Sequence, residues 1–164
     1  MICDEAAIAG NPTRQAVLRM NVGQICSQRA ITVSEAAPMS DVARLMRDEH
    51  VGAVVVTHGS FDHCSVVGII TDRDVMCAQL ERTADLSQLK ASDAMTVDPL
   101  VLSEFGPIDS AIEHMKARGV RRAPVVTDKG HPVGMISTDD LLAYFSLTLA
   151  GMAGIVSRQV RSES

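Results

Sequence analysis

A chain of 164 residues with 46% hydrophobic residues is long enough for one compact domain or two closely packed halves. Its net charge of −5 and aromatic content of 2% argue against nucleic-acid binding, which uses clustered cations and stacking rings. An acidic start, four cysteines without CxxC spacing and no apolar run long enough for a bilayer predict a cytoplasmic protein without a membrane partner.

Residues 1–21 have no counterpart elsewhere in the chain, and we expect an N-terminal arm that is helical from about Thr13 to Met20. Beyond the arm the chain repeats itself, because the pattern from Ser34 to Val56 returns from Ser103 to Val125. The sequence therefore predicts two repeats, 22–86 and 87–150, followed by a C-terminal helix extension and tail at 151–164.

The first repeat is predicted to run β-α-β-β-α, an α/β (α+β) arrangement in which helices cover a small sheet. Uninterrupted apolar segments are typical of strands that are buried on both faces. In the last helix, Cys77 is expected to face the core. The predicted elements are a strand at 31–33, a helix capped by Ser40 or Asp41, strands at Gly52–Val56 and Val66–Ile70, and a helix from Asp72.

The second repeat has the same predicted order, and its last helix is the longer one. The predicted elements are a strand at 100–102, a helix capped by Asp109 or Ser110 that stops at Gly119, strands at Ala123–Val126 and Val133–Ile136, and a helix over about Asp139 to Arg158. One repeat cannot bury the whole apolar face of that last helix. We therefore expect a homodimer, in which a second copy of the chain covers the face.

The corner between the last strand and the last helix is nearly identical in the two repeats: Gly68 to Asp74 is glycine, two apolar residues, a hydroxyl and an acid three positions later, and Gly134 to Asp140 repeats it. A helix N-terminus attracts a phosphate, to which a first-turn hydroxyl adds a hydrogen bond. A carboxylate one turn later suits the vicinal hydroxyls of a ribose.

By these arguments the corner residues of both repeats are predicted to bind the same type of ligand, one with a ribose and a phosphate. The predicted contacts are Asp74 and Asp140 for the ribose, Thr71 and Ser137 for the phosphate, Ile70 and Ile136 for apolar contact, and Gly68 and Gly134 for a close approach to a planar base. The alternative is structural, since hydroxyl-x-x-acid at a helix start is also the pattern of a capping box that needs no ligand.

With these motifs the chain resembles a tandem pair of CBS domains, the cystathionine-β-synthase-type regulatory module that is also called a Bateman module. The resemblance spans about residues 22–150. Besides the two corners it is carried by Val120–Val126 and by the openings Met95-Thr96 and Ser34-Glu35. It implies a pseudo-two-fold pair of repeats with two clefts. Such clefts often bind AMP, ADP, ATP, NAD or S-adenosylmethionine as regulatory ligands, so that no obligatory cofactor is implied.

Carried over residue by residue, the resemblance supports the ribose and phosphate roles given above and adds Arg121, with its neighbour Arg122, as phosphate contacts. The first repeat has Gly52 and Ala53 at the positions of Arg121 and Arg122, so Arg73 is expected to compensate there. The cleft with Ser137, Asp140 and Arg121 is therefore expected to suit a multiply charged phosphate better. The alternative for Arg121 and Arg122 is a solvated basic spot. The resemblance also implies an adenine shelf from Thr32 and Val33 in the second cleft and from Val101 and Leu102 in the first.

Other chemistry receives little support from the sequence. His58, His63 and Cys64 share a loop, but nothing fixes their geometry, and no metal site is predicted. Neither a Gly-x-Ser-x-Gly elbow nor a phosphate-binding Gly-x4-Gly-Lys loop occurs, and no enzymatic activity is expected. The sequence thus predicts a stand-alone sensor that binds an adenine nucleotide, shifts between dimer arrangements and signals to an unknown effector protein. The alternative is a dimeric interaction module without a physiological nucleotide.

Overall fold

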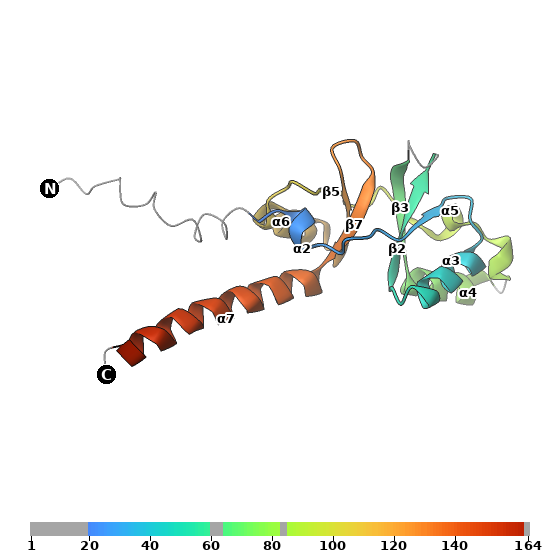
Figure 1. Ribbon diagram of the computed structural model, residues 1–164. Helices are drawn as coiled ribbons and strands as arrows, with labels where there is room; N and C mark the ends of the chain where they lie inside the picture. The colour runs from blue at the N-terminus through green and yellow to red at the C-terminus, as the bar shows by residue number, and fades with distance from the viewer. Residues whose placement is uncertain (1–19, 60–63, 83–84, 163–164) are drawn as a thin grey trace.

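The computed structural model describes residues 20–59, 64–82 and 85–162. Within them two small sheets lie beside each other, and the helix α7 extends away from both (Figure 1). The predicted helix between Thr13 and Met20 falls almost wholly outside the described residues. In the described part of the chain, no helix combines the length and the apolarity that crossing a membrane would require.

The first repeat has the predicted β-α-β-β-α order. Its elements are β1 (Thr32–Ser34), α3 (Met39–Asp48), β2 (Ala53–His58), β3 (Ser65–Thr71) and α4 (Asp72–Arg82). Strand β1 is parallel to β2, and β3 is antiparallel to it. The segment Ala53–Val56 is buried, as its unbroken apolar sequence predicts, and β2 and α3 supply much of the first core.

The second repeat reproduces this arrangement. Its elements are β5 (Leu102–Ser103), α6 (Ile108–Arg118), β6 (Arg122–Val126), β7 (Pro132–Ser137) and α7 (Thr138–Ser162). Strand β5 is parallel to β6, and β7 is antiparallel to it. The register shifts after Val125 just as it shifts after Val56 in the first repeat, so that the irregularity in the strand is duplicated together with the strand.

The opening segment of each repeat packs on the other repeat. Helix α2 (Val22–Ile25) contributes Val22 to the core of the second repeat, and the amide of Ser27 donates to the carbonyl of Met135 in β7 (2.9 Å). Likewise α5 (Ala91–Ala94) packs in the first core, and β4 (Thr96–Val97) adds an antiparallel strand to β3. The short 3-10 helix η3 (Leu86–Gln88) lies between α4 and α5 in the chain. The core of each repeat is therefore completed by residues from the opening segment of the other repeat.

Both predictions of a polar N-cap in the first helix of a repeat are wrong. Helix α3 is capped by Pro38 and α6 by Pro107, without a side-chain hydrogen bond, and the carbonyl of each proline accepts the first helical hydrogen bonds. The proline ring already sets a φ that suits the helix start, at −63° and −71°. The predicted capping residues therefore lie within the first turn; they are Ser40, Asp41, Asp109 and Ser110.

Two further sequence predictions concern α6 and α4. Gly119 ends α6 in the left-handed region (φ 64°), as predicted. The prediction that Cys77 faces the core is wrong, because Cys77 is exposed and its neighbour Met76 is 64% exposed. Helix α4 instead turns Val75 and Ala78 toward the core, at the i, i+3 spacing of one helix face.

Candidate functional site

The two corners have the same local geometry, and in both the hydroxyl and the acid form a capping box. The Oδ2 atom of Asp74 accepts from the amide of Thr71 (2.7 Å) and from its hydroxyl (2.7 Å). Asp140 Oδ2 accepts in the same way from the amide (2.8 Å) and the hydroxyl (2.6 Å) of Ser137. The structural alternative for these residues is therefore realised in this structure.

Capping does not use the whole carboxylate. All of these bonds end on Oδ2, and a carboxylate has a second oxygen with its own acceptor sites. Both aspartates are partly buried, at the start of α4 and α7. The cap thus fixes the orientation of each acid, and Oδ1 remains to accept hydrogen bonds from vicinal hydroxyls. The same residue can cap the helix and hold a ribose.

Two hollows open beside these corners. The first, the central hollow, has a volume of about 480 Å³ and lies where the N-termini of α4 and α7 face each other. Its lining residues are Ile69, Thr71, Asp72, Arg73, Thr96, Val120, Arg121, Arg122, Thr138 and Asp139. It therefore joins a corner hydroxyl of the first repeat to arginines of the second. Asp74 lies one turn behind Thr71 and is not among the lining residues.

The second hollow, the side hollow, has a volume of about 550 Å³. Its lining residues are Ser27, Arg29, Ile31, Glu49, His50, Val51, Gly52, Ala53, Arg122, Met135, Ser137 and Asp140. It joins the complete second corner to the start of β2 and to the exchanged opening segment. Both hollows have volumes typical of sites for small molecules.

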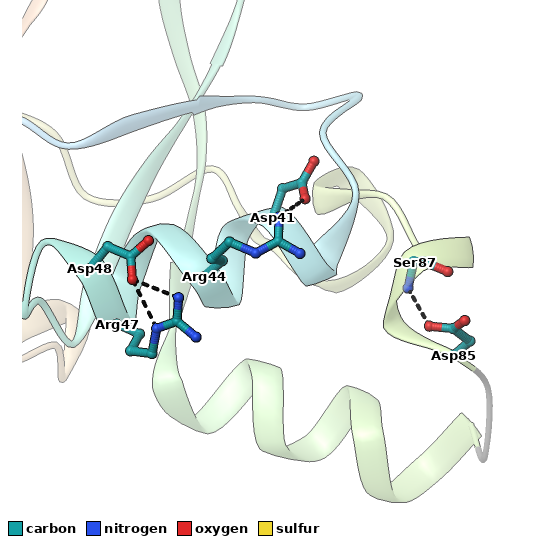
Figure 2. Close-up of polar contacts among 6 residues, drawn as sticks. All are labelled: Asp41, Arg44, Arg47, Asp48, Asp85 and Ser87. Atoms are coloured by element: carbon teal, nitrogen blue, oxygen red, sulfur yellow. Dashed lines mark hydrogen bonds and ion pairs between the residues drawn. The ribbon is translucent and has the colours of Figure 1, made fainter.

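The arginines at the central hollow differ from the other arginines whose side chains the structure describes. Outside it, Arg29, Arg44, Arg47 and Arg118 are each ion-paired with a carboxylate. Figure 2 shows two such pairs on α3, where Arg44 contacts Asp41 and Arg47 contacts Asp48.

Arg73, Arg121 and Arg122 form no ion pair with a carboxylate in the described part of the chain, although Asp72 and Asp139 line the same hollow. Three guanidinium groups that are left unpaired at one concave surface favour an anionic ligand there.

The structure groups these arginines differently from the sequence prediction. Arg121 lines the central hollow together with Thr71, and not the side hollow with Ser137 and Asp140, where it was predicted. Of these two neighbours, Arg122 is the one that reaches the side hollow. The reason is strand pairing: Arg122 is the residue opposite Ser137 in the ladder of β6 and β7, and residue 121 lies beyond that pair.

Ile70 and Ile136 do not lie in the hollows. Both are completely buried, one in each core. Successive residues of a strand face opposite sides, so the preceding residues Ile69 and Met135 line the central and the side hollow instead. The predicted apolar contact is thus available from the same strands, one residue earlier.

The remaining predicted shelf residues are not lining residues of either hollow. Val33 packs against the first core, and Leu102 belongs to the second core, because both strands turn one face inward. Thr32 and Val101 are exposed. Ile31 and Thr96, which lie at the ends of the exchanged segments, take the positions next to the hollows.

The two corner glycines make room for protein and not for a base. A Cβ on Gly134 would overlap the carbonyl oxygen of Ser27, and a Cβ on Gly68 would lie 2.5 Å from Met95 Sδ. Both neighbours belong to the exchanged opening segments. The sequence prediction was a close approach to a planar base, whereas the group that lies close to each glycine in the structure belongs to the other repeat.

One neighbour of the side hollow is electrostatically unusual. Burial raises the pKa of the Cys26 thiol, and the negative charges of Asp140 and Glu104 raise it further, against a smaller lowering by a backbone hydrogen bond. Cys26 is therefore a neutral core residue, packed behind the corner that holds Asp140.

His58 and Cys64, at the two ends of the longer loop, have different partners. His58 Nδ1 contacts Glu35 Oε1 (2.5 Å), whereas Cys64 Sγ contacts His131 Nδ1 (3.7 Å). His63 lies outside the described residues. In the described ranges no group of three or more potential metal-ligating side chains is present.

Comparison with known proteins identifies both repeats. A family model described as "CBS domain" matches residues 22–81 and again residues 91–147. A relative, an uncharacterized protein of Methanopyrus kandleri, is 27% identical over 123 residues, which are 75% of this chain. The matched region covers 61% of that relative's own length.

Solved structures show the same fold. The CBS domain pair of protein MJ0100, in complex with 5′-methylthioadenosine and S-adenosyl-L-methionine, superposes with a TM-score of 0.67 at 22% identity, over 78% of this chain and 97% of the other. A CBS domain protein from Pyrobaculum aerophilum, complexed with AMP, gives a TM-score of 0.66 at 25% identity, over 74% of this chain and 89% of the other.

Proposed function

The chain belongs to the CBS-domain family, and from this premise we propose that it is a regulatory protein that binds an adenosyl ligand, such as AMP, ADP, ATP or NAD, in its two hollows. The observation that carries the proposal is the set of three guanidinium groups beside Thr71, at the start of α4, that form no ion pair among the described residues. AMP in the Pyrobaculum protein and adenosyl compounds in the MJ0100 pair support this class of ligand.

The geometry supports the following proposed roles. Asp140 offers Oδ1 to the ribose in the side hollow, and Ser137 and Arg122 bind the phosphate. In the central hollow the phosphate meets Thr71, Arg73 and Arg121. Ile69 and Met135 supply the apolar contact with the base. Asp74 is the ribose acid of the first repeat, set one turn behind the hollow.

Regulation needs an element that changes with ligand binding, and we propose a homodimer built on α4 and α7. Exposed apolar side chains gather on these helices; they are Met76, Leu80, Leu142, Phe145, Leu149 and Met152. Both helices start at the hollows, so a ligand that favours one arrangement of the helix starts biases the dimer. An effector protein then responds to the dimer arrangement.

The same apolar faces favour a second candidate, a dimeric interaction module without a physiological nucleotide. In that case the hydroxyl-acid pairs are only caps, and the exposed helix faces carry the whole function. The two candidates differ in whether a ligand binds at the corners.

Isothermal titration calorimetry with AMP, ATP, NAD and S-adenosylmethionine tests the proposal. We expect binding of at least one of them, and a loss of about tenfold or more in affinity at the side hollow in Asp140→Ala, because charge-assisted hydrogen bonds to the ribose are lost. Asp109→Ala is the matched control, since Asp109 is also an acid in the first turn of a helix but is exposed and lines neither hollow. No heat with any of the four compounds would favour the interaction module.

A further inference from the structure

Arg122 lines both hollows, and it is the one residue that their two sets of lining residues share. It lies at the start of β6, opposite Ser137 in the strand ladder, and is partly buried. A single cation therefore forms part of the wall between two candidate phosphate sites.

The position of the guanidinium depends on the first repeat. Arg122 Nη1 donates to the carbonyl of Gly52 (3.0 Å), which also accepts from the amide of Asp72 at the start of α4 (3.3 Å). A Cβ at Gly52 would lie 3.0 Å from Nη1 and 3.3 Å from Nη2. The missing side chain of the first repeat thus makes the space that the arginine of the second repeat occupies.

The two hollows depend on this cation to different degrees. The central hollow also has Arg73 and Arg121, neither of which is ion-paired in the described part of the chain. The side hollow has Arg29, but Glu49, another lining residue, already holds that arginine in an ion pair (3.3 Å). Among its described arginines, only Arg122 is left to bind a phosphate.

We propose that the two hollows compete for Arg122, so that a phosphorylated ligand in the central hollow weakens the binding of a second phosphorylated ligand in the side hollow by about tenfold. The planar fork of a guanidinium pairs with one phosphate in bidentate geometry, and a phosphate in the central hollow draws Arg122 toward Arg73 and Arg121. This inference rests on the proposed function, because it requires that both hollows accept an adenosyl ligand.

The coupling is measured with AMP and with adenosine, which lacks the phosphate. Calorimetry gives the affinity of the side hollow when the central hollow is occupied and, in Asp74→Ala, when it is silenced. If Asp74→Ala does not fold, Arg73→Ala/Arg121→Ala silences the central hollow without touching the cap. We expect the affinity of the side hollow for AMP to be about tenfold lower when the central hollow is occupied than when it is silenced. For adenosine the two affinities should agree within about twofold.

The decisive comparison repeats the AMP measurement in Arg122→Gln. In this variant the two affinities of the side hollow for AMP are expected to agree within about twofold. Arg44→Gln, which removes an ion-paired surface arginine, should leave the tenfold ratio of these affinities unchanged. An unchanged ratio in Arg122→Gln, or the same ratio with adenosine, overturns the inference and leaves the proposed function standing. Absence of AMP and adenosine from both hollows overturns the inference together with the proposed nucleotide sites.

Discussion

The two repeats share their backbone and differ in the side chains that face the hollows. Both have the same strand pairing, the same register shift and the same capping box. At the start of the second strand, however, the first repeat has Gly52 and Ala53, and the second has Arg121 and Arg122. The comparison teaches that the features that build the fold occur in both repeats, whereas the pair of arginines occurs once, at a hollow that residues of both repeats line.

The largest difference in stability that we expect between the two repeats concerns the replacement of their corner glycines. Gly134→Ala would press a methyl group into the backbone carbonyl of Ser27, and we expect a loss of about 3 kcal/mol in the free energy of unfolding. Gly68→Ala meets the flexible end of Met95 and should cost about 1 kcal/mol. Urea denaturation followed by far-UV circular dichroism measures both, since the chain has no Trp. Equal losses would show that the two exchanged segments pack equally closely.

The capping boxes should be equivalent. Thr71→Ala and Ser137→Ala each remove one cap hydroxyl from nearly identical geometry, so each should lower the free energy of unfolding by about 1 kcal/mol. The same urea titrations apply, with Thr148→Ala as a control hydroxyl in the body of α7, where it donates to the carbonyl of Tyr144. A clear inequality between the two caps would mean that one corner carries strain that the other lacks.

A smaller effect is expected where the first helix of each repeat ends. His50 adopts φ 54° at the position where the second repeat has Gly119 at φ 64°. Because a left-handed φ strains any side chain with a Cβ, His50→Gly should raise the free energy of unfolding by about 0.5 kcal/mol, and Gly119→Ala should lower it by about 1 kcal/mol. Thermal melts of both variants test the pair. Destabilisation by His50→Gly would show that the imidazole contributes packing at the side hollow.

The smallest expected effect depends on pH. The pKa of Cys26 is raised in the folded protein, chiefly by burial, so the unfolded chain loses this thiol proton first as the pH passes the ordinary value near 9.0. The stability that the neutral thiol contributes is complete below that pH and is lost as the pH rises toward the folded-state pKa. The melting temperature of the wild-type protein should therefore fall more steeply above pH 9 than that of Cys26→Ala.

Cys77→Ser is the matched control for the loss of a thiol, because Cys77 lies at an exposed position outside the core. If Cys26→Ala shows the same slope as the wild-type protein, other groups determine the alkaline instability.

The fold was predictable from the sequence because its signals are local and occur twice. Uninterrupted apolar strands and the hydroxyl-acid corners recur in order, and these patterns report backbone geometry directly. The helix starts were missed at Pro38 and Pro107, because a nearby Ser or Asp suggests a side-chain cap even where a proline carbonyl accepts the first helical bonds.

The site was only partly predictable. The motif predicted Thr71, Ser137 and Asp140, which line the two hollows, but which arginine lies beside which corner depends on strand pairing between distant segments. Ile69 and Met135 were missed in favour of Ile70 and Ile136, although strand alternation, once anchored on a known core residue, would have separated the two faces. Ser27 and Arg29 carry no signal at all until the opening segment is seen to cross to the other repeat.

The crossing of the opening segments has a consequence for how the molecule melts. Cut near residue 85, the C-terminal fragment would lose Val22 and Cys26 from its interior, and the N-terminal fragment would lose Leu89 and Ala91 from its own. Neither fragment is self-sufficient, so the intact chain should come apart in a single cooperative step. A molecule bound at either end of the pair therefore protects the whole protein from heat and proteases, and not only the half that it touches.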